Sequence, residues 1–406
     1  MKKKNKIDYK NFIQKEYYFS KNNNYLKKSC SKILRNIQVN LDNNKNVFHS
    51  LSEKFLFNFK VKDLKNFKRY NNIVVIGMGG SILGSEAIYS FLRRKIKKKF
   101  IFLNNINDES LQEIKKKIRI NKTLFILISK SGNTVETLSN ILTLKILNKS
   151  KKNIIVISDR NTSPLYLVSK KLNLFYVEHK KYIGGRYSVL SEVGMLPAYL
   201  MGVNINKLRL NIRIHFKNKN STFLKSSLMK MSNILKNKKL KNLIFLNYIP
   251  ELNNFLYWSQ QLIAESLGKK GKGFLPVVSS APKDHHSLLQ LYLDGPKDKL
   301  IYVFSLKNLQ KSKINSKIFG PKMKFINNRS LQKIKNAQKN ALLKALKKNK
   351  IPFREFIISD LSEEVLGELF SFFMLETAII GYLIGIDPFN QPAVEQVKID
   401  TKRILS

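Results

Sequence analysis

The sequence predicts an α/β fold built from two doubly wound parallel sheets, with N-terminal helices and a C-terminal helical segment. From residue 72 onward, short β-branched runs alternate with helical segments, which is typical of parallel sheets. The same alternation begins again near residue 243. The chain has 406 residues, 43% of them hydrophobic, which is enough for two or three packed domains.

The strands expected in the two sheets are short apolar runs, as is typical of strands that are buried on both faces. The first sheet is expected from residues 73–76, 100–103, 124–128, 153–157 and 172–177, and the second from 243–246, 301–304 and 353–358. The helices expected between them span 81–93, 111–118, 134–147, 251–267 and 331–346.

This pattern divides the chain into four segments. Residues 1–50 are polar and rich in Lys and Asn, and we expect helices there that pack on a later domain. Residues 51–205 and 206–378 are each expected to form one α/β domain, with the Lys- and Asn-rich stretch 204–241 as the connection. Residues 379–406 are expected to form a C-terminal segment that packs on the active site.

The chain is strongly basic, with 75 Lys and Arg residues against 27 Asp and Glu, a formal net charge of +48. A basic surface can bind nucleic acid through phosphate contacts. Here the lysines are scattered over different segments, and the chain is also rich in Asn, Ile and Phe, which indicates a general drift in residue usage. We therefore expect no nucleic-acid partner, although the positive field would attract a small anion.

Targeting and redox signals indicate a cytoplasmic protein. The single cysteine, Cys30, excludes an intrachain disulfide and fits a reducing compartment. The basic residues at the start of the chain are not followed by the apolar region of a signal peptide. The apolar stretch 366–386 is long enough to span a bilayer, but Glu368 and Glu376 lie inside it. We expect a helix buried between domains or subunits, and no membrane association.

Two polar, glycine-containing loops follow predicted strands and open predicted helices. Residues 77–84 read Gly-Met-Gly-Gly-Ser-Ile-Leu-Gly, and residues 129–134 read Ser-Lys-Ser-Gly-Asn-Thr. Backbone amides at a helix N-terminus favour an anion, glycines let it approach, and hydroxyl groups add hydrogen bonds. The first loop has the spacing of neither a dinucleotide fingerprint nor a P-loop. Because both loops end strands of one sheet, the pair indicates a phosphate site, with plain strand-to-helix turns as the alternative.

Both loops resemble those of sugar-isomerase (SIS) domains, which hold phosphosugars. Residues 183–194, Ile-Gly-Gly-Arg-Tyr-Ser-Val-Leu-Ser-Glu-Val-Gly, closely resemble a signature of the phosphoglucose isomerase family. Segments 261–269, 283–291 and 387–398 are also similar to that family and occur in its order. The resemblance runs from about residue 70 to residue 400 and leaves the first 50 residues unmatched.

The resemblance implies reversible isomerisation of glucose 6-phosphate and fructose 6-phosphate through a cis-enediol, without a cofactor or a metal. It implies that Glu265 carries the proton between C2 and C1 and that Arg186 stabilises the enediolate. His286, helped by Lys398, would open the sugar ring. The residues implied in substrate binding are Gly80, Ser81, Ser129, Lys130, Ser131, Thr134, Gln261 and Gln391. The family also implies a homodimer in which His286 acts in the partner's pocket.

Physical chemistry independently supports part of these roles. A guanidinium at Arg186, placed after two glycines, could stabilise an oxyanion. Gln261 and Glu265 are four residues apart and share one helix face, and Gly268 is expected to end that helix. The helix dipole disfavours a negative charge at that end. His285 stands where the family pattern has glutamine, so which histidine acts stays open, and a metal site made from the pair is an alternative.

Other functions remain open from the sequence alone. A non-catalytic sugar-phosphate sensor could use the same domains, although Glu265, His286 and Lys398 together favour an enzyme. A nucleic-acid-binding protein should show clustered lysines with interleaved aromatic residues, which this chain does not. An isomerase that also accepts mannose 6-phosphate is a narrower alternative.

Overall fold

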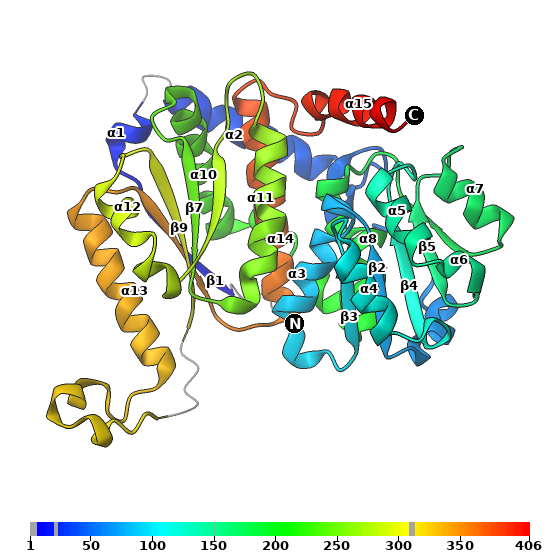
Figure 1. Ribbon diagram of the computed structural model, residues 1–406. Coiled ribbons are helices and arrows are strands. Elements are labelled where there is room, and N and C mark those ends of the chain that lie inside the picture. The colour runs from blue at the N-terminus through cyan, green and yellow to red at the C-terminus, as the bar shows by residue number, and fades with distance from the viewer. Residues whose placement is uncertain (1–5, 20–22, 150, 308–312) are drawn as a thin grey trace.

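Two five-stranded sheets organise the chain, as the computed structural model in Figure 1 shows for residues 6–19, 23–149, 151–307 and 313–406. The first sheet has the order β3-β2-β4-β5-β6 and is parallel throughout. Its strands are β2 (Asn72–Ile76), β3 (Lys99–Leu103), β4 (Thr123–Ile128), β5 (Ile154–Ser158) and β6 (Phe175–Glu178). Its helices are α3 (Leu83–Phe91), α4 (Asp108–Lys117), α5 (Val135–Thr143), α6 (Ile146–Lys149) and α7 (Pro164–Lys171).

The second sheet has the order β1-β10-β9-β7-β8, and only β1 runs antiparallel to its neighbour. Its strands are β1 (Ile7–Phe12), β7 (Asn242–Asn247), β8 (Leu275–Ser280), β9 (Lys299–Leu306) and β10 (Phe353–Ile358). The helices around it are α10 (Asn218–Asn237), α11 (Asn253–Leu267), α12 (Leu289–Asp294), α13 (Leu331–Lys348) and α14 (Glu363–Leu383). The predicted α/β class with two parallel-stranded units is confirmed; the four segment boundaries stay a prediction.

Three elements differ from the expectation. Residues 7–12 form strand β1, where only helices were expected, and pair with the edge of β10. Strand β8 was not predicted because Pro276 interrupts its apolar run; proline is tolerated there because β8 is an edge strand. The stretch 204–241 is more than a connection, since it contains the 20-residue helix α10.

The remaining helices lie between and beside the sheets. They are α1 (Lys15–Tyr18), α2 (Asn23–Val39), α8 (Glu192–Met201), α9 (Ile205–Arg209) and α15 (Glu395–Leu405). The expected helix 134–147 is divided into α5 and α6 at Lys145, whose φ is 52°. Helix α11 packs along α3 from the first unit and along α14, so that α11 lies where the two units meet (Figure 1).

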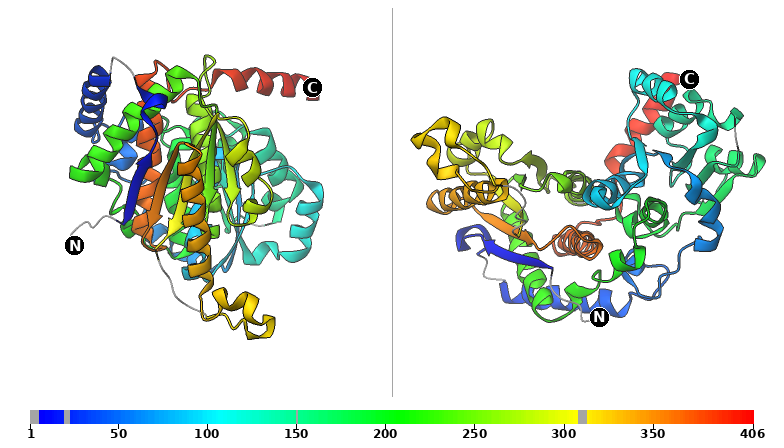
Figure 2. Two further views of the ribbon diagram at one scale, coloured as in Figure 1. Left: turned by 90° about the vertical axis from the view of Figure 1, so that its left-hand side faces the viewer. Right: turned by 90° about the horizontal axis from the view of Figure 1, so that it is seen from below.

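Helix α14 is buried at the centre of the chain (Figure 2, right). It is the only helix of the described residues long and apolar enough to cross a membrane, and 94% of its apolar window is buried inside the protein. The expected buried helix is thus confirmed, but it is covered within a single chain. The apolar stretch therefore gives no argument for a dimer.

Two carboxylates inside α14 have buried polar partners. Glu376 accepts a hydrogen bond of 2.6 Å from Nη1 of Arg354, a fully buried residue of β10. Glu368 accepts hydrogen bonds from Tyr9 of β1 at 3.1 Å and from Asn211 at 3.4 Å, and burial raises its pKa to about 7. These contacts tie the second sheet to α14 at its antiparallel edge.

We expect Glu376→Gln to destabilise the protein by about 3–5 kcal/mol, because it leaves the buried Arg354 guanidinium without its charge partner. Urea unfolding at neutral pH measures the change in the free energy of unfolding. The matched control is Glu109→Gln at an exposed position of α4, where a change below about 0.5 kcal/mol is expected. A Glu376→Gln protein within 1 kcal/mol of wild type would show that the pair contributes little to stability.

Candidate active site

The site forms where the loop after β2 meets α11 and the turn Gly185–Leu190. A Cβ atom on Gly80 would lie 2.3 Å from the carbonyl carbon of Gly185. Gly79 has a φ of +52°, and a Cβ there would lie 2.6 Å from Nε2 of Gln261. A side chain on Gly80 would meet the backbone of the turn, and the positive φ of Gly79 favours glycine there. The glycine pair therefore brings the first loop to both other walls of the site.

Arg186 is the centre of the site, with an exposed fraction of 4%. Its Nε donates to Ser266 Oγ at 2.9 Å. Its Nη1 donates to Glu265 Oε2 at 3.0 Å and to Gln391 Oε1 at 2.5 Å. Its Nη2 donates to the carbonyl oxygens of Pro388 and Asn390 at 2.8 and 2.9 Å. All five N–H groups of the guanidinium are thus hydrogen-bonded, and they join the turn, α11 and the C-terminal segment.

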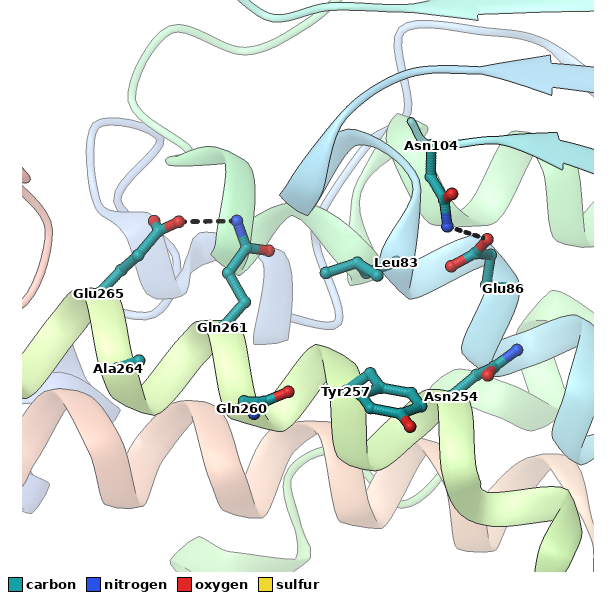
Figure 3. Close-up of a pocket in the computed structure, with 9 residues that line it drawn as sticks. All are labelled: Leu83, Glu86, Asn104, Asn254, Tyr257, Gln260, Gln261, Ala264 and Glu265. Carbon is teal, nitrogen blue, oxygen red and sulfur yellow. Dashed lines mark hydrogen bonds between the residues drawn. The ribbon is translucent and has the colours of Figure 1, made fainter. Parts of the chain in front are cut away.

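Glu265 lies in the last turn of α11, which ends directly before Gly268 as predicted. Its Oε1 accepts a hydrogen bond of 2.9 Å from Nε2 of Gln261, which confirms that the two side chains share a helix face (Figure 3). The carboxylate is one-third exposed. It is held between a neutral amide on one oxygen and a guanidinium on the other, so its orientation is determined while one face stays open.

A pocket of about 540 Å³ extends from Glu265 along α11 (Figure 3). Its lining residues are Leu83, Glu86, Asn104, Asn254, Tyr257, Gln260, Gln261, Ala264 and Glu265. None of them is basic, although the chain carries a net charge of +48. Glu86 accepts a hydrogen bond of 2.7 Å from Asn104, and burial raises its pKa to about 7. Sequence reasoning did not indicate Glu86, because no motif includes it.

The second loop gathers hydroxyl groups at the end of β4. The hydroxyls of Ser129 and Thr134 are 2.9 Å apart, and Ser129 Oγ also accepts a hydrogen bond from the amide of Gly132. Thr134 directly precedes α5, and Ser131 is exposed. Lys130 is different from the rest of the loop, since its Nζ donates to the carbonyl oxygens of Lys181 at 2.8 Å and Ile183 at 3.0 Å.

The structure distinguishes the two adjacent histidines. His285 is half-buried, its Nε2 lies 2.7 Å from the hydroxyl of Tyr248, and burial lowers its pKa. His286 is exposed on the turn Lys283–His286, and its ring makes no hydrogen bond with a described residue. Within the described ranges, no group of three metal-ligating side chains contains either histidine.

Two of the predicted catalytic residues lie apart from Arg186 and Glu265. Within the described part of the chain, no hydrogen bond or ion pair joins His286 to either of them. Lys398 lies on α15, which is exposed along nearly all of its length, and its Nζ is 2.7 Å from Glu395. Of the predicted C-terminal contacts, the structure therefore brings Gln391 into the site and leaves Lys398 outside it.

The chain is similar to known proteins over most of its length. The family model described as phosphoglucose isomerase matches residues 35–406. A glucose-6-phosphate isomerase of Methanocaldococcus jannaschii is 33% identical over 89% of this chain and 90% of its own length. One of Campylobacter jejuni is 30% identical over 82% and 85%. The crystal structure of a glucose-6-phosphate isomerase from Chlamydia trachomatis has the same fold, with a TM-score of 0.79 at 18% identity over 98% of this chain and 88% of its own. The chain belongs to the phosphoglucose isomerase family.

Proposed function

We propose that this protein interconverts glucose 6-phosphate and fructose 6-phosphate. The observation that carries the proposal is the placement of Glu265 between Gln261 and Arg186, beside the first glycine loop. Relatives that cover most of the chain are named glucose-6-phosphate isomerase. We also propose that the protein is cytoplasmic and acts in glycolysis and gluconeogenesis.

The two loops would hold the phosphate group. The hydroxyls of Ser129 and Thr134 already lie within hydrogen-bond distance of each other at the N-terminus of α5, where backbone amides favour an anion. Ser81 and Ser131 would add hydroxyl contacts, and the amides of Gly80 and Lys130 would complete the shell. With the phosphate fixed there, the sugar carbons would reach toward Glu265.

Glu265 would take the proton from C2 of the open-chain sugar and return it to C1 through a cis-enediol. The negative charge of Glu265 is needed to take the proton from C2. Once Glu265 has accepted this proton, its carboxyl group is neutral. Its attraction to Nη1 of Arg186 then weakens just as negative charge appears on the enediolate oxygen. Arg186 can thus transfer a charge-assisted hydrogen bond from Glu265 to the intermediate, while Gln391 and the two carbonyl oxygens keep the guanidinium in place.

His286 would open the sugar ring from the partner subunit of a homodimer. In the single chain it is exposed beside β8, an edge strand whose Leu275 is 64% exposed. Nearby elements also expose Tyr257 and Leu291 at 48% each. An uncovered edge with apolar side chains is suited to a second copy of the chain. Lys398 would assist after α15 moves onto the occupied site.

A coupled assay that follows the conversion of fructose 6-phosphate to glucose 6-phosphate tests the function, with mannose 6-phosphate as the second substrate. Glu265→Gln keeps the shape of the side chain and removes the base, so kcat should fall by about 10²–10⁴-fold. Binding of fructose 6-phosphate, measured by calorimetry, should change by no more than a few-fold. Turnover of this variant within a few-fold of wild type would exclude Glu265 as the proton carrier.

Mixing two inactive proteins tests the shared site. After subunit exchange between Glu265→Gln and His286→Ala proteins, half of the dimers are hybrids with one intact site each, so activity should return to about one quarter of wild type. The control His285→Gln should stay active. Full activity in a protein that sediments as a monomer would reject the dimer. Subunit exchange without any rescue would reject only the contribution of His286 in trans.

A further inference from the structure

The ammonium group of Lys130 contacts the segment that leads to Arg186. Its two acceptors, the carbonyl oxygens of Lys181 and Ile183, lie between β6 and the turn Gly185–Leu190. Ile183 is only three residues from Arg186. The backbone of Lys130 belongs to the second loop, so one residue connects the loop to the segment that holds the central arginine.

The carboxylate of Asp159, a half-buried residue, also lies near this ammonium group. The amide of Asp159 donates to the carbonyl oxygen of Lys130 at 3.0 Å. Burial lowers the pKa of Lys130, and the Asp159 carboxylate opposes part of that shift. Oδ1 of Asp159 is buried and accepts no hydrogen bond from a described residue. His179 lies 3.6 Å from it, but burial lowers the pKa of His179 to about 3, so this histidine is neutral and is no ion-pair partner. Burial raises the pKa of the Asp159 carboxyl, and the nearby charges of Lys130 and Lys181 oppose part of that shift.

The segment from Ile183 to Arg186 is short, and hydrogen bonds hold the turn that follows it. The amide of Tyr187 donates to the carbonyl oxygen of Gly184 at 3.0 Å, and Ser188 Oγ donates to that of Gly185 at 2.6 Å. Gly185 in turn contacts Gly80 of the first loop. These contacts hold the backbone of the turn that carries Arg186.

We infer that the side chain of Lys130 is a positioning residue, which couples phosphate in the second loop to the placement of Arg186 beside Glu265. The inference rests on the proposed function and adds to it a role for the side chain, where the family resemblance gave only substrate contact. Because a misplacement of about 1 Å can lower a rate by about 10²-fold, loss of this contact should reduce turnover. Phosphate affinity should be retained, since hydroxyls and backbone amides bind the anion.

The test compares Lys130→Met with Lys181→Met. Lys181 is exposed, and its contact with the Lys130 ammonium uses its backbone carbonyl oxygen, so its variant keeps that contact and should retain wild-type turnover. For Lys130→Met, we expect kcat to fall by about 10²-fold. Calorimetry should show binding of inorganic phosphate within about 3-fold of wild type. Binding of a five-carbon aldonic acid 5-phosphate, which mimics the enediolate, should weaken as much as kcat/KM. The double variant with Ser129→Ala and Thr134→Ala should lose phosphate affinity. It therefore serves as the control that calorimetry can detect such a loss.

The other possible results contradict either the inference or the proposed function. If Lys130→Met loses phosphate affinity in parallel with kcat, Lys130 binds the phosphate directly and the inference is wrong. Unchanged kcat also overturns it. If Lys130→Met does not fold, the same comparison is made with Lys130→Arg, which keeps the charge: we expect at least a 3-fold fall in kcat with phosphate affinity retained, and unchanged kcat again overturns the inference. A wild-type protein without isomerase activity would overturn the proposed function instead.

Discussion

The site depends on the need to satisfy a buried guanidinium. Arg186 is 4% exposed, and a charge so far from water must find a partner for each of its donors. Hydrogen bonds to charged groups contribute about 1.5–3 kcal/mol each, and an unpaired buried donor costs a similar amount. The five acceptors come from α11 and from residues 388–391 of the C-terminal segment. Satisfying one side chain therefore places the Glu265 carboxylate and the C-terminal segment together.

A second buried arginine has a comparable role away from the site. Arg354 of β10 pairs with Glu376 of α14 and also donates to the hydroxyl of Tyr302 at 2.8 Å. Helix α14 packs against α11, which carries Gln261 and Glu265. The charged groups inside an otherwise apolar helix thus connect that helix to the second sheet, and α14 in turn packs against α11.

Much of the fold could be predicted because parallel strands buried on both faces are continuous apolar runs. Strands β1 and β8 could not, since the sequence of β1 is largely polar and β8 contains Pro276. The glycine loops, Arg186 and the shared face of Gln261 and Glu265 followed from the motifs. The position of Glu86 did not, because it depends on how α3 packs against α11. Nor could the sequence show that residues 366–386 are covered within one chain.

The most direct measurement of the central role of Arg186 is the activity of Arg186→Lys. Lysine keeps the positive charge, but its three donors cannot replace five N–H groups in a planar fork. The account predicts a folded protein whose kcat is at least about 10²-fold below that of wild type. A variant with turnover within about 3-fold of wild type would show that charge alone suffices, which contradicts the arrangement described.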